Sequence, residues 1–399
     1  MIKKKSFATK ILPVSSESIK FCVNKSKKHN FNASSLVISS PDTLKALQQA
    51  VQILKEGSFP IAFPTETVYG LGADASNSKA VMSIFRTKNR PADNPLIVHI
   101  SSLHQLQNIF HSDIKNTDIE NLIPPIYTPL INRFWPGPLT IILPVKNSKI
   151  SPIVVANKDT VAVRMPSNII ALAIIALFDM PIAAPSANIS TRPSPTLASH
   201  VYSDLKGKIP IIIDGGPCDI GLESTVVDGL VDPPVILRPG SITKEHIMAC
   251  GGKWENVIVY TQKNTNEALQ TNLRAPGMKY KHYSPKAKVV LFESVSEKSI
   301  VNWVIQNIDV NVEKKTFIGI MRTMHWKKEN LIDIYSKWRT LDCELGCTGR
   351  EITKNIFSSL RDMDSQNVDI ILVEGVQEQN EGLAIMNRIR CSASVIVLS

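Results

Sequence analysis

The sequence lacks any apolar run long enough to cross a membrane as a helix. Its longest uninterrupted apolar run, Ile169 to Phe178, has ten residues, whereas a membrane-spanning helix needs about 20. Aromatic residues make up only 6% and charged residues only 20% of the 399 residues, while 43% are hydrophobic. This composition excludes a collagen, a coiled coil and a mostly disordered chain, and the length predicts two or three globular domains without membrane contact.

Cysteine is scarce and shows no pattern. The six cysteines form no CxxC pair and have no metal-type spacing with histidine. Cys343 and Cys347 are four residues apart, which suits one face of a helix but is a weak ligand pair. We therefore expect reduced thiols, as in the cytosol or an organelle matrix, and no metal site built by the protein alone.

Arginine is absent from the first 41 residues, although this segment carries most of the net charge. It holds eight lysines and one acid, a formal charge of +7 out of +10, which leaves +3 for the other 358 residues. Residues 1–40 are expected to be a basic flexible tail. A Lys- and Ser-rich, acid-poor extension is typical of an organelle transit peptide, and equally of a solvated extension. The nearly neutral remainder disfavours a large surface that follows nucleic-acid phosphates.

Residues 41–250 mix helical and strand patterns and predict one α/β domain. Pro41 begins an amphipathic helix that Gly57 ends. A short strand is expected at 59–63, followed by the loop PTETVYGLGADA and then by a helix in which Val81, Ile84 and Phe85 face inward. A further helix is expected at 167–179. Elements mixed without strict alternation indicate a twisted mixed sheet flanked by helices. Further strand-like runs occupy 96–100, 139–143, 160–165, 182–187, 209–214, 224–228 and 234–238.

A second domain is expected after a polar linker. The pattern fades over 251–287, which is rich in Gly, Asn, Gln and Thr and reads as an interdomain linker or lid. Alternation resumes over 288–399, with strand-like runs such as VVLF, FIGIM and VDIILVEG separated by helical patterns. We predict a smaller, Rossmann-like parallel α/β unit there.

The usual phosphate-binding and hydrolytic motifs are missing. There is no GxxxxGK[ST] segment. Gly70, Gly72 and Ala75 match GxGxxA, but six residues separate the strand from the first glycine, and a dinucleotide fingerprint needs a tight turn there. No Ser–His–Asp pattern or isolated carboxylate pair stands out.

Six short clusters of cations and hydroxyls instead follow apolar strands. Strand ends are where open sheets place ligands, and grouped cations and hydroxyls suit an anionic, polyphosphate-bearing ligand. From these patterns alone, the chain is an anion- or nucleotide-binding α/β enzyme. The clusters are PTETVYG, RTKNRPADNPLIVH, TVAVRMP, APSANISTRPSPT, GLESTVV and LRPGSIT.

The same segments, in this order, resemble the YrdC-like threonylcarbamoyl-AMP synthase family. FPTETVYGLG, KNRPADNPLIVHI, FWPGPLT, VAVRMP, APSAN, GLESTVVD and LRPGSIT carry the resemblance over residues 42–250. APGMKYKHYSP and GLAIMNRIR extend it to the two-domain branch of that family. The resemblance implies a YrdC-like domain followed by the smaller α/β domain.

The resemblance also implies a reaction. Threonine and bicarbonate give a carbamate, which attacks the α-phosphate of ATP to form threonylcarbamoyl-adenylate and pyrophosphate. ATP is thus a substrate, and magnesium would accompany it. A separate complex would transfer the threonylcarbamoyl group to adenosine 37 of ANN-decoding tRNAs, and the synthase itself does not require tRNA binding. The implied location is the cytoplasm, with the mitochondrion added if the tail is a transit peptide.

The resemblance further implies individual roles. The KxR and SxN signatures fall on Lys88 and Arg90 and on Ser186 and Asn188, the expected catalytic groups. Cations there would screen the repulsion between an anionic carbamate and a triphosphate. The residues implied at ATP are Arg90, Asn94, Thr160, Ser186, Ser194, Arg238 and Tyr283, and those implied at threonine are Thr67, His99, Arg164, Ser224 and the backbone of Ala184.

Two positions depart from the family pattern, and one of them is Cys391, where a basic residue is more usual. The family usually has glycine after SANxS, and this chain has Thr191. Glycine at such a position allows a positive φ, a backbone conformation that is unfavourable for threonine.

Two other functions compete with the synthase. One is an RNA- or nucleic-acid-binding module that uses the basic tail. The other is a carbamoyl-transfer domain such as hydrogenase maturation proteins contain, but their acylphosphatase-like and zinc-finger parts are absent from this sequence. The polar segment 251–287, which includes Tyr283, is expected to close over bound nucleotide as a lid.

Overall fold

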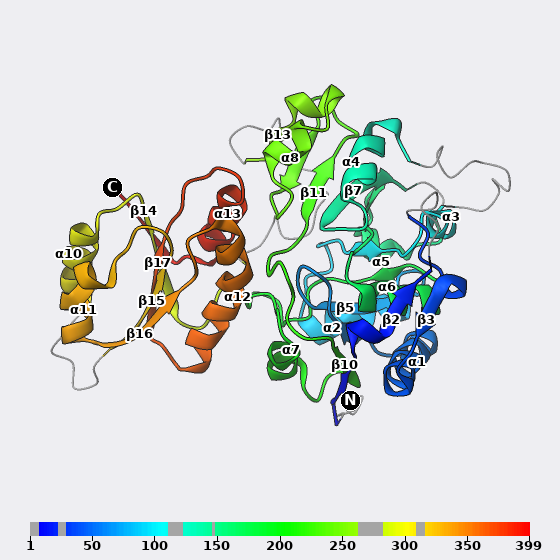
Figure 1. Cartoon of the computed structure of the whole chain (residues 1–399), viewed down its shortest axis with the longest axis horizontal. Helices are drawn as coiled ribbons and strands as arrows, with labels where there is room; N and C mark the ends of the chain where they lie inside the picture. The colour runs from blue at the N-terminus through cyan, green and yellow to red at the C-terminus, as the bar shows by residue number, and fades with distance from the viewer. Residues whose placement is uncertain (1–7, 23–28, 111–122, 146–147, 262–281, 309–315) are drawn as a thin grey trace. The chain divides into compact units, whose positions relative to one another are not determined.

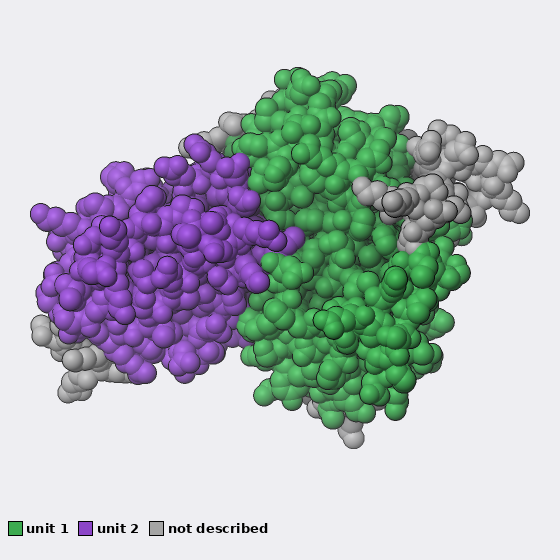
Figure 2. Space-filling view, viewed as in Figure 1, with its two compact units in different colours: residues 1–190, 194–219, 223–279 green, residues 191–193, 220–222, 280–399 purple. Residues whose placement is uncertain are grey.

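The computed structural model of the chain describes residues 8–22, 29–110, 123–145, 148–261, 282–308 and 316–399. Its contacts divide the chain into two compact units (Figure 2). Unit 1 holds residues 1–190, 194–219 and 223–279, and unit 2 holds 280–399 with two short segments, 191–193 and 220–222. Among the helices in these described ranges, none is long and apolar enough to cross a membrane.

Unit 1 is built on an eleven-stranded mixed sheet, which confirms the predicted sheet type. Parallel pairs such as β6 with β8 alternate with antiparallel pairs such as β7 with β8. In spatial order the strands are β1 (Lys10–Pro13), β10 (Ile211–Asp214), β4 (Ile61–Phe63), β5 (Gly70–Asp74), β9 (Ile182–Ala183), β6 (Ile97–His99), β8 (Thr160–Arg164), β7 (Leu139–Pro144), β11 (Thr225–Asp228), β12 (Val235–Arg238) and β13 (Ile258–Val259).

Helices cover both faces of this sheet, because strand residues alternate between two apolar clusters. Ile61 and Phe63 pack with α1 and α6, whereas Ala62 between them packs with α2, α4 and α7. The predicted ends of α1 are confirmed: Pro41 begins it and Gly57 ends it at φ 63°. The helices of unit 1 are α1 (Pro41–Glu56), α2 (Ser78–Lys88), α3 (Gln105–Ile109), α4 (Thr128–Phe134), α5 (Pro152–Val155), α6 (Ile169–Phe178), α7 (Ala198–Leu205) and α8 (Lys244–Met248).

The prediction of a flexible tail over residues 1–40 is wrong for the described part of that segment. β1 pairs in parallel with β10 and thereby joins the main sheet, and β2 (Ile19–Phe21) pairs with β3 (Leu36–Ile38). The reason is that Val14 and Ile19 are buried in the cluster below α1 and α6. A cleaved leader would therefore have to end before Lys10, or its removal would strip a strand from the sheet.

Two predictions along unit 1 are corrected in the same way. The segment Gly70–Asp74, expected to be loop, is strand β5 between β4 and β9. Its glycine at 72 fits a close contact, since a Cβ there would lie 2.8 Å from Cγ2 of Ile182. Residues 251–261, expected to belong to the linker, contain β13, which pairs with β12. Of the other linker residues, 262–281 lie outside the described residues, and 282–287 belong to unit 2.

Unit 2 confirms the predicted parallel α/β domain. Its five-stranded sheet is parallel throughout, in the order β16-β15-β17-β14-β18. Figure 1 shows α10 and α11 on one face of this sheet and α12 and α13 on the other. The elements are β14 (Lys288–Glu293), α10 (Glu297–Asn307), β15 (Phe317–Arg322), α11 (Ile332–Lys337), β16 (Arg339–Glu344), α12 (Gly349–Ser365), β17 (Ile370–Glu374), α13 (Gly382–Ser392) and β18 (Val395–Leu398).

Thr191 has the positive φ predicted from the sequence. Its φ is 80°, and its carbonyl accepts a 2.7 Å hydrogen bond from the amide of Ser284 within unit 2. A β-branched residue in this region is strained, typically by about 1–3 kcal/mol.

We therefore expect Thr191→Gly to stabilise the protein by about 1 kcal/mol, after the entropy cost of glycine is subtracted. The thermal midpoint should rise by about 2–4 °C. Thr191→Ala is the matched control, because it removes the branch but keeps the Cβ, and it should give a smaller rise. A glycine variant that melts at or below the wild-type temperature would contradict the strain.

Candidate active site

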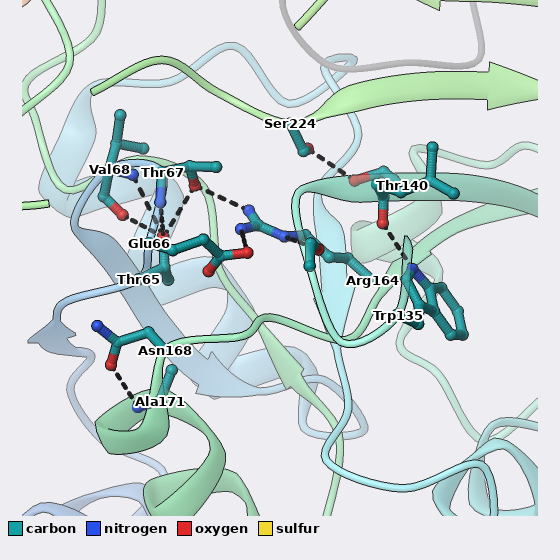
Figure 3. Close-up of polar contacts among 12 residues, drawn as sticks. Thr65, Glu66, Thr67, Val68, Trp135, Thr140, Arg164, Asn168, Ala171 and Ser224 are labelled. Carbon is teal, nitrogen blue, oxygen red and sulfur yellow. Dashed lines mark hydrogen bonds and ion pairs between the residues drawn. The ribbon is translucent and has the colours of Figure 1, made fainter. Parts of the chain in front are cut away.

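Arg164, at the carboxyl end of β8, is the centre of a buried polar cluster in unit 1. Its side chain is 4% exposed. Its Nη1 donates to Oγ1 of Thr67 at 2.9 Å, its Nε donates to the Gly137 carbonyl at 3.3 Å, and its Nη2 lies 2.7 Å from Oε1 of Glu66 (Figure 3). The guanidinium is thus fixed by three different partners. A fixed, buried guanidinium is well suited to bind a carboxylate.

The loop that carries Glu66 and Thr67 connects β4 to β5 and is shaped by Thr65. Oγ1 of Thr65 accepts hydrogen bonds from the amides of Thr67 and Val68, each at 3.2 Å, and donates to the Val68 carbonyl at 2.7 Å (Figure 3). Such a side-chain turn fixes the backbone locally. The sequence reasoning missed this role of Thr65, although its place beside a proline is the usual setting for it.

Ser224 joins the same cluster from the segment before β11. Its Oγ lies 2.8 Å from Oγ1 of Thr140, and Thr140 is the register partner of Arg164 (Figure 3). Arg238 donates through Nη2 to the Ser224 carbonyl at 3.0 Å and to its Oγ at 3.2 Å. Gly240 allows this approach, since a Cβ there would lie 2.6 Å from the Glu223 carbonyl oxygen.

His99, the last residue of β6, is also a register partner of Arg164. Burial, followed by the charge of Arg164, lowers the pKa of His99 to about 3. Its imidazole is therefore neutral near pH 7, and its buried Nδ1 has no hydrogen-bond partner among the described residues. A neutral ring can present a donor or an acceptor to a hydroxyl.

The pKa of His99 predicts a pH-dependent stability. Because the folded pKa lies below the unfolded value near 6.5, the unfolded chain binds the extra proton, and stability falls as pH drops from about 6.5 towards 3. At pH 5 this amounts to about 2 kcal/mol. His99→Gln should reduce the loss of stability between pH 7 and pH 5 by that amount in chemical denaturation. The exposed histidine His104 supplies the control His104→Gln, which should keep the wild-type dependence.

Lys88, at the end of α2, lies inside the loop that carries Ser186 and Asn188. The lysine is 1% exposed. Its Nζ donates to the Ser186 carbonyl at 2.5 Å, to the Asn188 carbonyl at 2.6 Å, and to Oδ1 of Asn188 at 3.4 Å. An ammonium has three hydrogens. These contacts make Lys88 a residue that shapes the loop, whereas its direct contact with phosphate stays a prediction.

Three further residues expected at the nucleotide are Arg90, Asn94 and Thr160. Arg90 donates through Nε to the Asn94 carbonyl at 3.2 Å and through Nη2 to the Pro95 carbonyl at 2.9 Å. Thr160 lies four residues before Arg164 on the same face of β8. Nδ2 of Asn94 and Oγ1 of Thr160 are buried without a hydrogen-bond partner in the described ranges. Buried polar groups normally have partners, so these atoms mark places where a ligand can bind.

Ser194 and Ala184 complete the residues expected in unit 1. Oγ of Ser194 donates to Oε1 of Glu223 at 2.5 Å. Glu223 directly precedes Ser224 in the chain. Ala184 directly follows β9, and its amide donates to the Ile97 carbonyl at 2.9 Å. The acid Glu223 was not predicted as part of the site.

Tyr283 is buried within unit 2. It is 6% exposed, its ring stacks on Phe357 of α12 with centroids 5.0 Å apart, and the guanidinium of Arg388 lies 5.6 Å from its centroid. Its φ is 63°, so its backbone is in the left-handed region. Its contact with nucleotide stays a prediction.

The structure joins the expected unit 1 residues in small groups. Arg164 binds Thr67, Arg238 binds Ser224, and Lys88 binds the carbonyls of Ser186 and Asn188. Chemically, these groups offer buried cations and hydroxyls, and within the described residues no group of three or more His, Cys, Asp or Glu side chains could hold a metal ion. Such a site suits the binding and positioning of anions more than acid–base chemistry.

Comparisons with known proteins agree with this chemistry. A family model described as "Telomere recombination" matches residues 52–240, and one described as "Threonylcarbamoyl-AMP synthase, C-terminal domain" matches residues 242–394. The chain is 49% identical to the threonylcarbamoyl-AMP synthase of Schizosaccharomyces pombe over 97% of this chain and 98% of the relative. It is 41% identical to that of Bacillus subtilis over 87% of this chain and 92% of the relative. The crystal structure of P. abyssi Sua5 complexed with L-threonine covers 98% of this chain and 100% of its own, with 38% identity and a TM-score of 0.76.

Proposed function

The chain belongs to the two-domain threonylcarbamoyl-AMP synthase family, and from that premise we propose that it converts ATP, L-threonine and bicarbonate into threonylcarbamoyl-adenylate and pyrophosphate. The observation that carries the proposal is the fixed guanidinium of Arg164, which binds Thr67 and whose register partner Thr140 lies 2.8 Å from the hydroxyl of Ser224. It provides a carboxylate-binding group beside hydroxyls, as an amino acid with a polar side chain requires.

In this proposal Arg164 grips the threonine carboxylate. Two N–H groups of a guanidinium bind two carboxylate oxygens in parallel, which fixes the orientation of the amino acid. Thr67 and the neutral His99 then recognise the threonine hydroxyl. A competitor that lacks this hydroxyl leaves buried polar groups unpaired, which lowers its affinity.

The nucleotide would extend from the threonine along the face of β8. Thr160 and Arg164 are four residues apart on that face, a distance of about 13 Å at the rise of a strand. The buried Nδ2 of Asn94 would donate a hydrogen bond to ATP, and the buried Oγ1 of Thr160 would donate one to ATP or accept one from it. The reacting carbamate and α-phosphate would meet between the two ends.

Catalysis would rest on position and charge. The carbamate oxygen attacks the α-phosphorus, the bond to the bridging oxygen breaks, and pyrophosphate leaves with the negative charge. Arg90 and Arg238 would stabilise that charge, and Lys88 would act by holding Ser186 and Asn188 in place. The carbamate is itself the nucleophile, so no covalent enzyme intermediate is required.

Magnesium would come with ATP. The described residues provide no carboxylate cluster for it, so the donor set favours an ion held by the phosphates. The ion would screen the phosphate charge, and none of the steps above is assigned to it.

The product would be passed to a separate complex that modifies adenosine 37 of ANN-decoding tRNAs. We place the protein in the cytoplasm and, where the first residues serve as a leader, also in mitochondria. The free state of all six cysteines supports a reducing compartment.

Pyrophosphate release tests the proposal. Purified protein with ATP should release pyrophosphate only when both L-threonine and bicarbonate are present. Release that is indifferent to threonine would reject the synthase activity.

A further inference from the structure

Glu66 is a buried acid that no role in the proposed reaction uses. It is 4% exposed and lies in the β4–β5 loop between Thr65 and Thr67. Its Oε1 forms an ion pair with Nη2 of Arg164 at 2.7 Å (Figure 3). Neither carboxylate oxygen has a hydrogen-bond partner of good geometry among the described residues.

Such a carboxylate is costly to bury. An ionised carboxylate accepts about four hydrogen bonds, and burial without them costs several kcal/mol even beside an opposite charge. The Thr65 turn nevertheless holds the backbone of Glu66 at this point of the loop. The carboxylate therefore presents unused acceptor capacity towards the binding site.

Arg164 already has partners in two other directions. Nε donates to Gly137 and Nη1 to Thr67. A substrate carboxylate bound to the same guanidinium would place a second negative charge close to Glu66. Two carboxylates at one cation repel each other unless a further cation joins them.

The register partner of Arg164 on strand β6 does not supply that cation. His99, the register partner of Arg164, is held neutral by its buried position beside the guanidinium. A zwitterionic α-amino acid brings the missing charge itself, because its ammonium is separated from its carboxylate by a single carbon. An ammonium also has three N–H donors, and the oxygens of Glu66 can accept hydrogen bonds from them.

We propose that Glu66 binds the α-ammonium of threonine and makes this site select α-amino acids over the corresponding hydroxy acids. The inference deepens the proposed function and rests on it. It concerns the zwitterion that enters the site, before the nitrogen loses a proton and forms the carbamate. Arg164 and Glu66 then form a complementary pair, one for each charge of the zwitterion.

The test compares two ligands on the full chain by calorimetry without ATP. The first is L-threonine, and the second is 2,3-dihydroxybutanoate of the same configuration, in which a hydroxyl replaces the ammonium. In Glu66→Gln we expect threonine to bind about 10- to 100-fold more weakly, as the loss of a charged hydrogen bond predicts. The hydroxy acid should bind as before or more tightly, because Arg164 loses its competing charge.

Other outcomes would overturn the inference. If both ligands weaken equally, Glu66 only orients Arg164, and if neither weakens, it does not touch the ligand. Asp228→Asn, at another buried acid of unit 1 whose Oδ1 accepts from the amide of Leu230, is the matched control and should leave the ratio of the two affinities unchanged. Should Glu66→Gln fail to fold, Glu66→Asp can replace it, because it keeps the charge on a shorter side chain. This variant should lower the affinity for threonine and leave the affinity for the hydroxy acid unchanged.

The failure of the proposed function would look different. If wild-type protein binds neither ligand, the threonine site itself is refuted. If wild-type binds threonine but the two affinities shift together in the variants, only the role of Glu66 is refuted.

Discussion

Replacement of Arg164 by alanine should lower kcat/KM for threonine by about a hundredfold to a thousandfold, the usual effect of removing a charged group that holds the reactant. Arg164 contacts Glu66, Thr67 and the Gly137 carbonyl together. Its loss removes the carboxylate-binding group and the orientation of the amino acid at once.

The alanine variant also leaves Glu66 as a buried charge without its partner, which would destabilise unit 1 by about 3–5 kcal/mol. Arg164→Lys separates the two effects, because it keeps the charge but loses the planar fork. We expect it to fold like wild type and to raise KM for threonine more than KM for ATP. An Arg164→Lys enzyme with wild-type KM values would contradict the carboxylate role.

Lys88→Met should lower kcat by a similar factor, for a different reason. The ammonium of Lys88 holds the carbonyls of Ser186 and Asn188, so its removal leaves buried acceptors unpaired and frees the loop. Hydrogen exchange at the amides of Ala187 and Ser190 provides the decisive measurement, since these bond to the Tyr69 and Lys88 carbonyls. Both should exchange faster in the variant.

The control for this variant is Lys79→Met, an exposed lysine on the same helix, which should keep wild-type activity and exchange. Lost activity together with unchanged exchange at Ala187 and Ser190 would show that Lys88 acts directly on the phosphates, and would refute its role in shaping the loop.

The sequence predicts those elements whose stability is local or strongly apolar. The caps of α1 and the apolar run of α6 are visible in the residues themselves. Strand β5 is not, because GLGAD has the composition of a loop and becomes a strand only between β4 and β9. The short strand β1 is equally hidden, since its pairing partner β10 lies about 200 residues further along the chain.

The site shows the same division. The resemblance of the ordered motifs to a known family is sufficient to name Arg164, Ser224 and the loop at Ser186 as candidates. The place of Glu66 is not predictable, because its significance depends on a guanidinium 98 residues away that only the folded β8 brings within 2.7 Å. The inward direction of Lys88 is hidden for the same reason, since a lysine in the last turn of a helix usually extends to solvent.

The most direct test follows the carbon of bicarbonate. Purified full-length protein is incubated with ATP, L-threonine and ¹³C-bicarbonate, and the products are separated and identified by mass spectrometry. The account predicts an adenylate in which the labelled carbon joins the threonine nitrogen to the AMP phosphate. One pyrophosphate should be released for each molecule of this adenylate. AMP or ADP without labelled carbon, at any threonine concentration, would contradict it.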